Sequence, residues 1–301
     1  MLPPRPLISV TLPNYNYGRF LAQALESILT QTYENLEILL TEDGSTDDSR
    51  AIAERYARQD RRIKPVYFPS NQGALVAHAD TWQRVRGEII YQFSSDDYLV
   101  DPDFFRFGVE ALAQHPQAAG FYGAADVIVI ETGLSRVVMG WGEPAGFIAP
   151  FPFLKGFLSG RFFVPGISSL WRKSGIDAVG GYDTQLGPQT DYFINHALPA
   201  RSGAVFMPKI FAHARDSAAR KSFSSSATLE DEMRRLALFA AKLRDLTRHS
   251  GDLETDWSNW RRGQAAQLVQ KFGRATLAAG PILSAGPQAR GTALDGPRAV
   301  R

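Results

Sequence analysis

The sequence predicts an α/β protein with a mainly parallel sheet flanked by helices and a helical extension toward the C-terminus. Three observations carry this prediction. Strand-like and helix-like patterns alternate through roughly the first third of the 301 residues, polar residues follow each of those strands, and a long amphipathic helix comes late in the chain. The hydrophobic content of 44% and the charged content of 21% are typical of a globular protein.

The first part of the chain alternates between short apolar segments and segments with apolar residues at helical spacing. The expected strands cover residues 7–13, 36–41, 63–68 and 88–93, and the expected helices cover 19–30, 45–58 and 74–86. Three consecutive strand–helix–strand units imply right-handed crossovers. We therefore expect parallel strands with helices on both faces of the sheet.

After residue 102 the alternation becomes looser. We expect helices over 103–115, 150–159 and 188–200, and strands over 120–130, 136–141 and 163–171. A regular apolar stripe predicts a further helix over 229–246. The expected organisation is a sheet-containing domain of residues 1–225, a helical extension of 226–274, and a disordered tail of 275–301 that is rich in Ala, Gly, Pro and Arg.

Composition excludes several classes of protein. The net charge of +2 gives no field for binding nucleic acid, so we expect no nucleic-acid partner. The absence of cysteine excludes disulfides, thiolate metal sites and cysteine nucleophiles. The first ten residues lack the apolar stretch of a signal peptide, and no window reaches the ~18 apolar residues of a membrane span. We expect a cytoplasmic protein, with peripheral contact at the inner face of the membrane left open.

The helix expected over 229–246 leaves three arrangements open: packing on the core, a homodimer, or contact with a membrane surface. Packing is the default for such a stripe. Trp257 and Trp260 stand beside Arg261 and Arg262, a composition that suits an interface with anionic lipid. The same residues equally suit a contact within the protein, which we favour.

Polar residues follow each of the first four expected strands. They occupy residues 13–16, 42–45, 70–73 and 94–97. Ligands bind outside the carboxyl ends of the strands in open parallel sheets, so all four clusters are expected at one edge of the sheet. Their coincidence at that edge predicts a binding site.

The chemistry of this edge favours a nucleotide. Tyr15 offers a flat face for a base, and Asp43 can accept a hydrogen bond from a base N–H or a ribose hydroxyl. Asp96 and Asp97 are hard oxygen ligands suited to Mg²⁺ or Mn²⁺, and such an ion would offset the charge of a diphosphate. The alternatives are a packing aromatic at 15, a turn residue before Gly44, and a solvated turn at the acid pair.

Several nucleotide and metal motifs are absent. No G-x-G-x-x-G follows the first strand, which disfavours a dinucleotide fold. The P-loop pattern G-x-x-x-x-G-K-[ST] and the zinc-protease pattern H-E-x-x-H do not occur either. The site at the sheet edge therefore needs another explanation than these motifs.

Three blocks of the chain resemble the family 2 glycosyltransferases, which have the GT-A fold. They begin ISVTLPNYNYGRF at residue 8, NQGALVAHAD at residue 71 and ISSLWRKSG at residue 167, and together they cover most of residues 7–200. The resemblance implies an inverting glycosyltransferase that moves a hexosyl-type sugar from a nucleotide diphosphate sugar, commonly UDP-linked, to a hydroxyl. The acceptor would be a saccharide or a lipid-linked sugar, in polysaccharide or glycoconjugate synthesis for the cell envelope.

The resemblance also implies roles for particular residues. Asp191 matches the proposed general base, which would take the proton from the acceptor hydroxyl. Gly180 and Gly181 match the acceptor-side loop that precedes it. The matching donor-binding positions are Pro13, Tyr15, Asp43, Asn71, Gly73, Asp96 and Arg220, and the implied ligands of a Mn²⁺ or Mg²⁺ cofactor are Asp97, Asp96 and His213. His213, Arg215, Arg220 and Lys221 are expected in one polar loop, residues 212–222.

Two positions depart from the family pattern. Ser94 stands where an acid usually begins the Asp-x-Asp-Asp motif, which predicts weaker metal binding. Thr190 stands where a glutamate commonly precedes the base. These departures keep open a second hypothesis, a catalytically silent member that binds a nucleotide sugar or scaffolds a pathway. A nucleotidyltransferase is a third hypothesis, but it would carry a Gly-rich basic loop after the first strand, and residues 13–19 (PNYNYGR) are not one.

Overall fold

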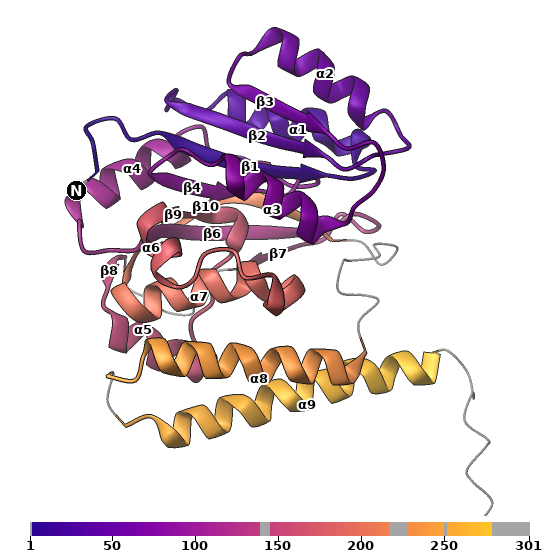
Figure 1. Ribbon diagram of the computed structural model, residues 1–301. Coiled ribbons are helices and arrows are strands. Elements are labelled where there is room, and N and C mark those ends of the chain that lie inside the picture. Colours follow the sequence, from indigo (N-terminus) through magenta and orange to yellow (C-terminus); the bar gives the residue numbers. More distant parts are fainter. Residues whose placement is uncertain (1, 139–144, 217–227, 250–251, 279–301) are drawn as a thin grey trace, which may run out of the picture.

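The computed structural model describes residues 2–138, 145–216, 228–249 and 252–278. Within these ranges the chain forms a ten-stranded sheet with helices on both faces and a helical hairpin along one side (Figure 1). The strand order is β3-β2-β1-β4-β9-β6-β10-β5, with β7 paired to β6 and β8 paired to β10. The predicted α/β class with a central sheet and a helical C-terminal region is confirmed.

The first four strands form the parallel half of the sheet. They are β1 (Ile8–Asn14), β2 (Leu36–Glu42), β3 (Ile63–Tyr67) and β4 (Ile89–Gln92), and they pair in parallel in the order β3-β2-β1-β4. The crossovers contain α1 (Gly18–Leu29), α2 (Ser49–Gln59) and α3 (Ala74–Arg84). Because the strands run in the same direction, their carboxyl ends meet at one edge, as the sequence predicted.

One helix of this half begins later than the sequence suggested. The pattern placed a capped start at Ser45, whereas α2 begins at Ser49. The intervening turn is held by Asp47, whose carboxylate accepts the backbone N–H groups of Gly18 at 2.9 Å and Ser49 at 3.0 Å. These bonds connect the segment before α2 to the start of α1. Residues 45–48 therefore form a loop instead of the first turn of α2.

The second half of the sheet is mixed. Its long strands, β6 (Gly120–Val129) and β10 (Ala204–Asp216), are parallel to each other. Between this pair and β4 lies β9 (Ser169–Arg172), which is antiparallel to both β4 and β6. The short strands β5 (Tyr98–Leu99), β7 (Ser135–Val138) and β8 (Gly146–Ile148) also pair antiparallel. The sheet is therefore wholly parallel only in its N-terminal half.

The strand expected over 163–171 is wrong for most of its length. Residues 166–168 form a short 3₁₀ turn, and the strand begins only at Ser169. Pro165 has no N–H to donate to a strand ladder, and Ser168 uses its hydroxyl to donate to the carbonyl of Gly123. The segment expected over 136–141 starts at Ser135, and its residues beyond 138 lie outside the described ranges.

Four further helices complete the sheet-containing part. They are α4 (Phe104–Gln114), α5 (Pro150–Leu158), α6 (Lys173–Ala178) and α7 (Thr190–Ser202), which a 3₁₀ segment, Thr184–Gln189, precedes. Two hydrophobic clusters hold the layers together. One packs α1, α2 and α4 on the sheet, and the other joins the sheet to α5, α7 and the C-terminal helices. The start of α7 reaches the same edge of the sheet as the strand ends, which positions Asp191.

The C-terminal hairpin consists of α8 (Leu229–Leu246) and α9 (Glu254–Ala278) and lies alongside α5 and α7 (Figure 1). Thr228 and Asp231 form a reciprocal capping box that starts α8 at the predicted residue. Trp257 and Trp260 are buried in the hydrophobic cluster, so the contact within the protein that we favoured is confirmed. The helix α9 includes residues 275–278 of the expected tail, and the rest of that tail lies outside the described ranges.

None of the helices in the described ranges has both the length and the apolar composition needed to cross a membrane.

Candidate functional site

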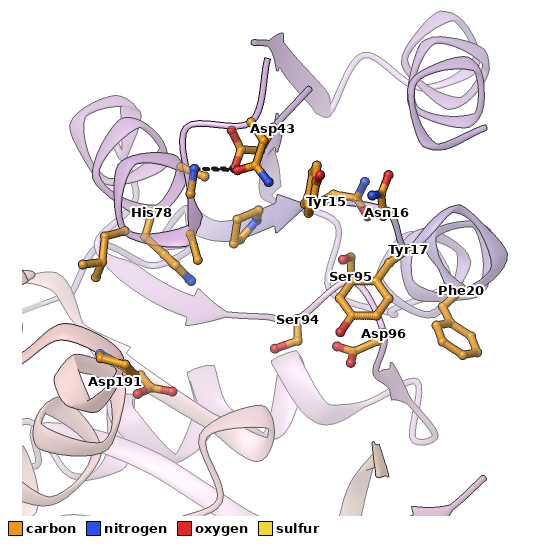
Figure 2. Close-up of a pocket in the computed structure, with 18 of the residues that line it drawn as sticks. Tyr15, Asn16, Tyr17, Phe20, Asp43, His78, Ser94, Ser95, Asp96 and Asp191 are labelled. Carbon is orange, nitrogen blue, oxygen red and sulfur yellow. Dashed lines mark hydrogen bonds between the residues drawn. The ribbon is translucent and has the colours of Figure 1, made fainter. Parts of the chain in front are cut away.

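A cavity of about 720 Å³ opens at the carboxyl edge of the parallel strands. Its walls come from the ends of β1, β2 and β4, the starts of α1, α3 and α7, and the end of β10 (Figure 2). The predicted site residues that line it are Pro13, Tyr15, Asp43, Asn71, Gly73, Asp96 and Asp191. The topology thus brings together residues that lie up to 178 positions apart in the sequence.

Tyr15 lies where β1 leaves the sheet. Tyr15 is 39% exposed and lines the cavity, so it is available to a ligand instead of being packed in the core. The next residue, Asn16, has a positive φ of 55° and is held by hydrogen bonds to the loop after β2. Its backbone N–H donates to the Ser45 hydroxyl at 2.9 Å, and its side-chain oxygen accepts the N–H of Thr46 at 2.8 Å. The loop after β1 is therefore held against the loop after β2.

Asp43 has both a structural contact and a place on the cavity wall. The residue is 2% exposed, and its carboxylate accepts the backbone N–H groups of Gln72 at 2.7 Å and Gly73 at 2.9 Å. Gly73 has a φ of 92°, which favours glycine, and is the N-cap residue directly before α3. The turn beside it also needs Gly44, because a Cβ there would lie 2.3 Å from the carbonyl carbon of Ser70. Asp43 thus shapes the loop while its edge faces the cavity.

The acid pair is divided between the cavity and the sheet. Asp96 lines the cavity together with Ser94 and Ser95 (Figure 2). Asp97 does not line it, and its Oδ1 accepts the backbone N–H of Arg215 at 3.0 Å. Arg215 also donates from Nη1 to the carbonyl oxygen of Asp96. The loop after β4 is therefore tied to the end of β10, with one of its two carboxylates directed at the cavity.

The oxygen atoms available at Asp96 suit a cation that arrives bound to a substrate. Within the described ranges, no group of three His, Asp or Glu side chains is arranged to hold a metal ion. The described residues therefore do not surround a metal ion with protein ligands alone. However, Mg²⁺ is usually held by one or two carboxylates, with substrate phosphates and water as the remaining ligands. The buried Asp96 carboxylate, beside the hydroxyls of Ser94 and Ser95, meets that requirement.

His213 lies on β10 and not in the polar loop that the sequence suggested. Its Nδ1 is 2.9 Å from the Tyr98 hydroxyl, and its Nε2 is 3.9 Å from a carboxylate oxygen of Asp126. It does not line the cavity. Its role as a metal ligand, and that of Asp97, stay predictions. Arg220 and Lys221 lie outside the described residues.

Asp191 stands in the first turn of α7, across the cavity from Asp96 (Figure 2). Its Oδ1 accepts the backbone N–H of Tyr192 at 2.7 Å. Desolvation by the surrounding protein raises the pKa of Asp191, and the backbone N–H bonds partly oppose this shift. Because the carboxyl group opens to the cavity, water there limits the effect. A carboxylate with a raised pKa is better suited to accept a proton at neutral pH.

The residue before the candidate base has a structural role. Thr190 is buried, and its hydroxyl lies 2.6 Å from the carbonyl oxygen of Asp183 and 2.9 Å from that of Gly187. These contacts hold the turn that precedes α7. Thr190 therefore fixes the position of Asp191 through the backbone, where the family pattern has a glutamate.

Sequence reasoning missed a stacked pair on the cavity wall. The rings of His78 and Tyr182 lie 5.2 Å apart with an interplanar angle of 17°, and both residues line the cavity. Burial lowers the pKa of His78 to about 4, so the imidazole is neutral at pH 7. Desolvation and the charge of Asp191 raise the pKa of Tyr182. The available signal in the sequence was the glycine pair Gly180 and Gly181, which directly precedes Tyr182. In the structure both glycines have positive φ.

With this geometry established, comparison with known proteins identifies the family. The model of the family described as Glycosyl transferase family 2 matches residues 9–173, more than half of the chain. The chain belongs to glycosyl transferase family 2. The matched region runs from β1 to the end of β9. It includes the cavity-lining residues named above, apart from Tyr182, Asp191 and the residue at the end of β10.

Curated relatives of this family 2 chain include bacterial glycosyltransferases. Glycosyltransferase GlyG of Streptococcus pneumoniae is 42% identical over 93 residues, which cover 31% of this chain and 31% of GlyG. The putative teichuronic acid biosynthesis glycosyltransferase TuaG of Bacillus subtilis is 36% identical over 93 residues, covering 31% of this chain and 37% of TuaG. The chain thus matches about a third of the length of these relatives.

Solved structures share the fold at low sequence identity. TarS 1–349 of S. aureus, in complex with UDP-GlcNAc, superposes with a TM-score of 0.67 at 15% identity, covering 91% of this chain and 75% of that one. The mannosyltransferase PcManGT of Pyrobaculum calidifontis, in complex with GDP-Man and Mn²⁺, gives a TM-score of 0.54 at 18% identity, covering 92% and 77%. These likenesses establish the fold of the chain, including the region beyond the family 2 match.

Proposed function

We propose that this protein is an inverting glycosyltransferase that moves a sugar from a nucleotide diphosphate sugar to a hydroxyl acceptor. The observation that carries the proposal is the cavity at the strand edge. It places an exposed aromatic ring, Tyr15, and a buried carboxylate, Asp43, on one side, with Asp96 and Asp191 facing each other across the space (Figure 2). This is the set of groups that binding and activating such a donor requires.

The donor is proposed to lie along the strand ends. Tyr15 and Pro13 would contact the base, and Asp43 would accept from the base or the ribose while its other lone pairs hold Gln72 and Gly73. Asn71 and Gly73 line the same wall. A UDP-linked donor is favoured because TarS, which has the same fold, was solved with UDP-GlcNAc. Arg220 would complete the diphosphate contacts.

Asp191 is proposed as the general base. The acceptor hydroxyl gives its proton to the Asp191 carboxylate as its oxygen attacks the anomeric carbon, and the bond to the diphosphate oxygen breaks. Attack from the side opposite the leaving group inverts the anomeric configuration. Mn²⁺ or Mg²⁺, held by Asp96 and by the substrate phosphates, would offset the charge that develops on the departing diphosphate.

The acceptor is proposed to be a growing saccharide or a lipid-linked sugar in the synthesis of a cell-envelope polysaccharide. The relative TuaG, a putative teichuronic acid biosynthesis glycosyltransferase, supports this class. We further propose that the protein acts in the cytoplasm, with its acceptor at the inner face of the membrane. The silent-scaffold hypothesis is less favoured, because Asp43, Asp96 and Asp191 are all retained on the cavity wall.

A thermal-shift screen tests the proposal. The full chain is heated with UDP, GDP, dTDP and their sugar conjugates, each with and without Mn²⁺. A ligand present at 100 times its dissociation constant stabilises the folded state by about 2.7 kcal/mol. For a protein of this size that corresponds to a rise of about 4 °C in Tm. A Tm that stays constant with every nucleotide would favour the silent scaffold and count against the proposal.

A further inference from the structure

The turn before α7, residues 183–190, runs along helix α8. At one end of the turn, Lys242 Nζ lies 2.8 Å from a carboxylate oxygen of Asp183. At the other end, the side-chain amide of Gln189 donates to the Glu232 carboxylate at 2.8 Å. The two α8 residues are ten positions apart, which corresponds to about 15 Å along a helix. One helix therefore holds the turn at both ends.

The middle of the turn leaves room for an α8 side chain. Gly187 has a φ of 56°, in the region that favours glycine. A Cβ at this position would lie 2.9 Å from Nε and 3.3 Å from Cζ of Arg235, so a larger residue would displace the guanidinium. Arg235 in turn donates from Nη1 to Oε1 of Glu232 at 3.0 Å. The contacts of α8 with Gly187 and Gln189 thus meet at the Glu232 carboxylate.

Glu232 is buried at the centre of these contacts. The residue is 3% exposed, and its two carboxylate oxygens accept from Arg235 and Gln189. A buried carboxylate is costly unless it is paired and hydrogen-bonded. The start of α8 does not require it, because Thr228 and Asp231 form the capping box. The bond to Gln189, which lies outside α8, therefore accounts for the position of this buried acid.

The turn connects these contacts to the cavity. Gln189 is the N-cap residue of α7, and Asp191 follows in the first turn of that helix. Pro188 and Asp191 line the cavity, whereas no residue of α8 is among the described residues that line it. Any effect of α8 on the reaction must therefore pass through the turn. A displacement of a reacting group by about 1 Å can lower a rate about a hundredfold.

We propose that Glu232 is a positioning residue for Asp191 and acts through Gln189. The inference rests on the proposed function, in which Asp191 is the general base. The bond between Gln189 and Glu232 fixes the start of α7 and thereby directs the Asp191 carboxylate at the acceptor hydroxyl. Both Asp191 and α8 lie beyond residues 9–173 of the family match. The C-terminal hairpin therefore contributes to the reaction through this contact.

Transfer kinetics on the full chain test this role. Sugar transfer or donor hydrolysis is measured for the wild type, Glu232→Ala, Gln189→Ala and the double variant. Each single variant should lower kcat about tenfold, with the KM of the donor and the affinity for UDP unchanged, because α8 does not reach the strand ends that bind the donor. The double variant should lower kcat no further, because both substitutions remove the same hydrogen bond. Gln189 is half-buried, so its variant tests the contact even if Glu232→Ala does not fold.

Two variants of the same hairpin serve as controls. Arg244→Ala removes an α8 ion pair with Glu254 of α9. Trp260→Ala removes an aromatic ring that packs on Phe157 and Phe239. Neither contact involves the turn, so both variants should keep the wild-type kcat at a temperature where they are folded.

The outcomes separate the positioning role from the proposed function. A loss of kcat in Glu232→Ala and Gln189→Ala, but not in the controls, supports the role. Additive losses in the double variant, an equal loss in Trp260→Ala, or a wild-type kcat in Gln189→Ala would overturn it. The base assignment then still stands if Asp191→Asn abolishes transfer. If the wild type transfers sugar from no donor, or if Asp191→Asn transfers normally, the base assignment and the positioning role fail together.

Discussion

Replacing Asp43 with asparagine should destabilise the loop that carries the start of α3. The Asp43 carboxylate is buried and accepts two backbone N–H groups, from Gln72 at 2.7 Å and Gly73 at 2.9 Å. Asparagine keeps one acceptor oxygen but places its NH₂ group against the second N–H. One charge-assisted bond is lost and one buried donor is left unpaired, which together cost about 2–4 kcal/mol of unfolding free energy. Urea denaturation measures this loss as a lower midpoint.

Asp47→Asn is the matched control for this prediction. The Asp47 carboxylate also accepts two backbone N–H groups, from Gly18 and Ser49, but Asp47 is exposed and lies outside the cavity. Water can replace the lost bond there, so we expect a loss of about 1 kcal/mol and unchanged UDP affinity. The reasoning fails if Asp43→Asn lowers the unfolding free energy by less than about 0.5 kcal/mol, or if both variants weaken UDP binding equally.

Three further predictions follow from burial. The imidazole NMR signals of His78 should not titrate between pH 5.5 and 8, because burial lowers its pKa to about 4, and a midpoint near 6.5 would contradict this. The buried His196 also has a pKa lowered to about 4, so the unfolded state takes up a proton first as pH falls. Stability should therefore decline between pH 6.5 and 4 by up to about 1.4 kcal/mol per unit, and urea midpoints that stay constant over that range would refute this. Trp260→Ala should lower the free energy of unfolding, measured by urea denaturation, by about 3–5 kcal/mol, because the Trp260 ring lies 5.6 Å from those of Phe157 and Phe239. A loss below about 1 kcal/mol would show that α9 packs loosely.

The sequence predicted the parallel half of the sheet because its signals are local. Each of the strands β1 to β4 is a short apolar run, and each intervening helix repeats apolar residues at helical spacing. The direction of the strands then places their polar ends together without any further information. Tyr15, Asp43 and Asp96 were found in this way, from their positions after strands.

Other features depend on contacts between distant segments. His78 and Tyr182 lie 104 positions apart, and no periodicity connects a residue on α3 to a loop after α6. The antiparallel insertion of β9 between β4 and β6 likewise depends on pairing that a four-residue strand does not encode. The division of the acid pair could not be predicted either, because Asp97 turns toward the backbone of Arg215 on β10.

The most direct test of the proposed function compares wild-type protein with Asp191→Asn. Sugar transfer or hydrolysis from the donor that gives the largest thermal shift is measured in parallel with the affinity for UDP. Because Asp191 lies across the cavity from Asp43 and Asp96, the proposal predicts that transfer is lost while UDP binds with unchanged affinity. The pKa of Asp191 is raised, so the rate of the wild type should begin to fall with decreasing pH above the ordinary pKa range of aspartate. Normal transfer by Asp191→Asn would contradict the assignment of this carboxylate as the base.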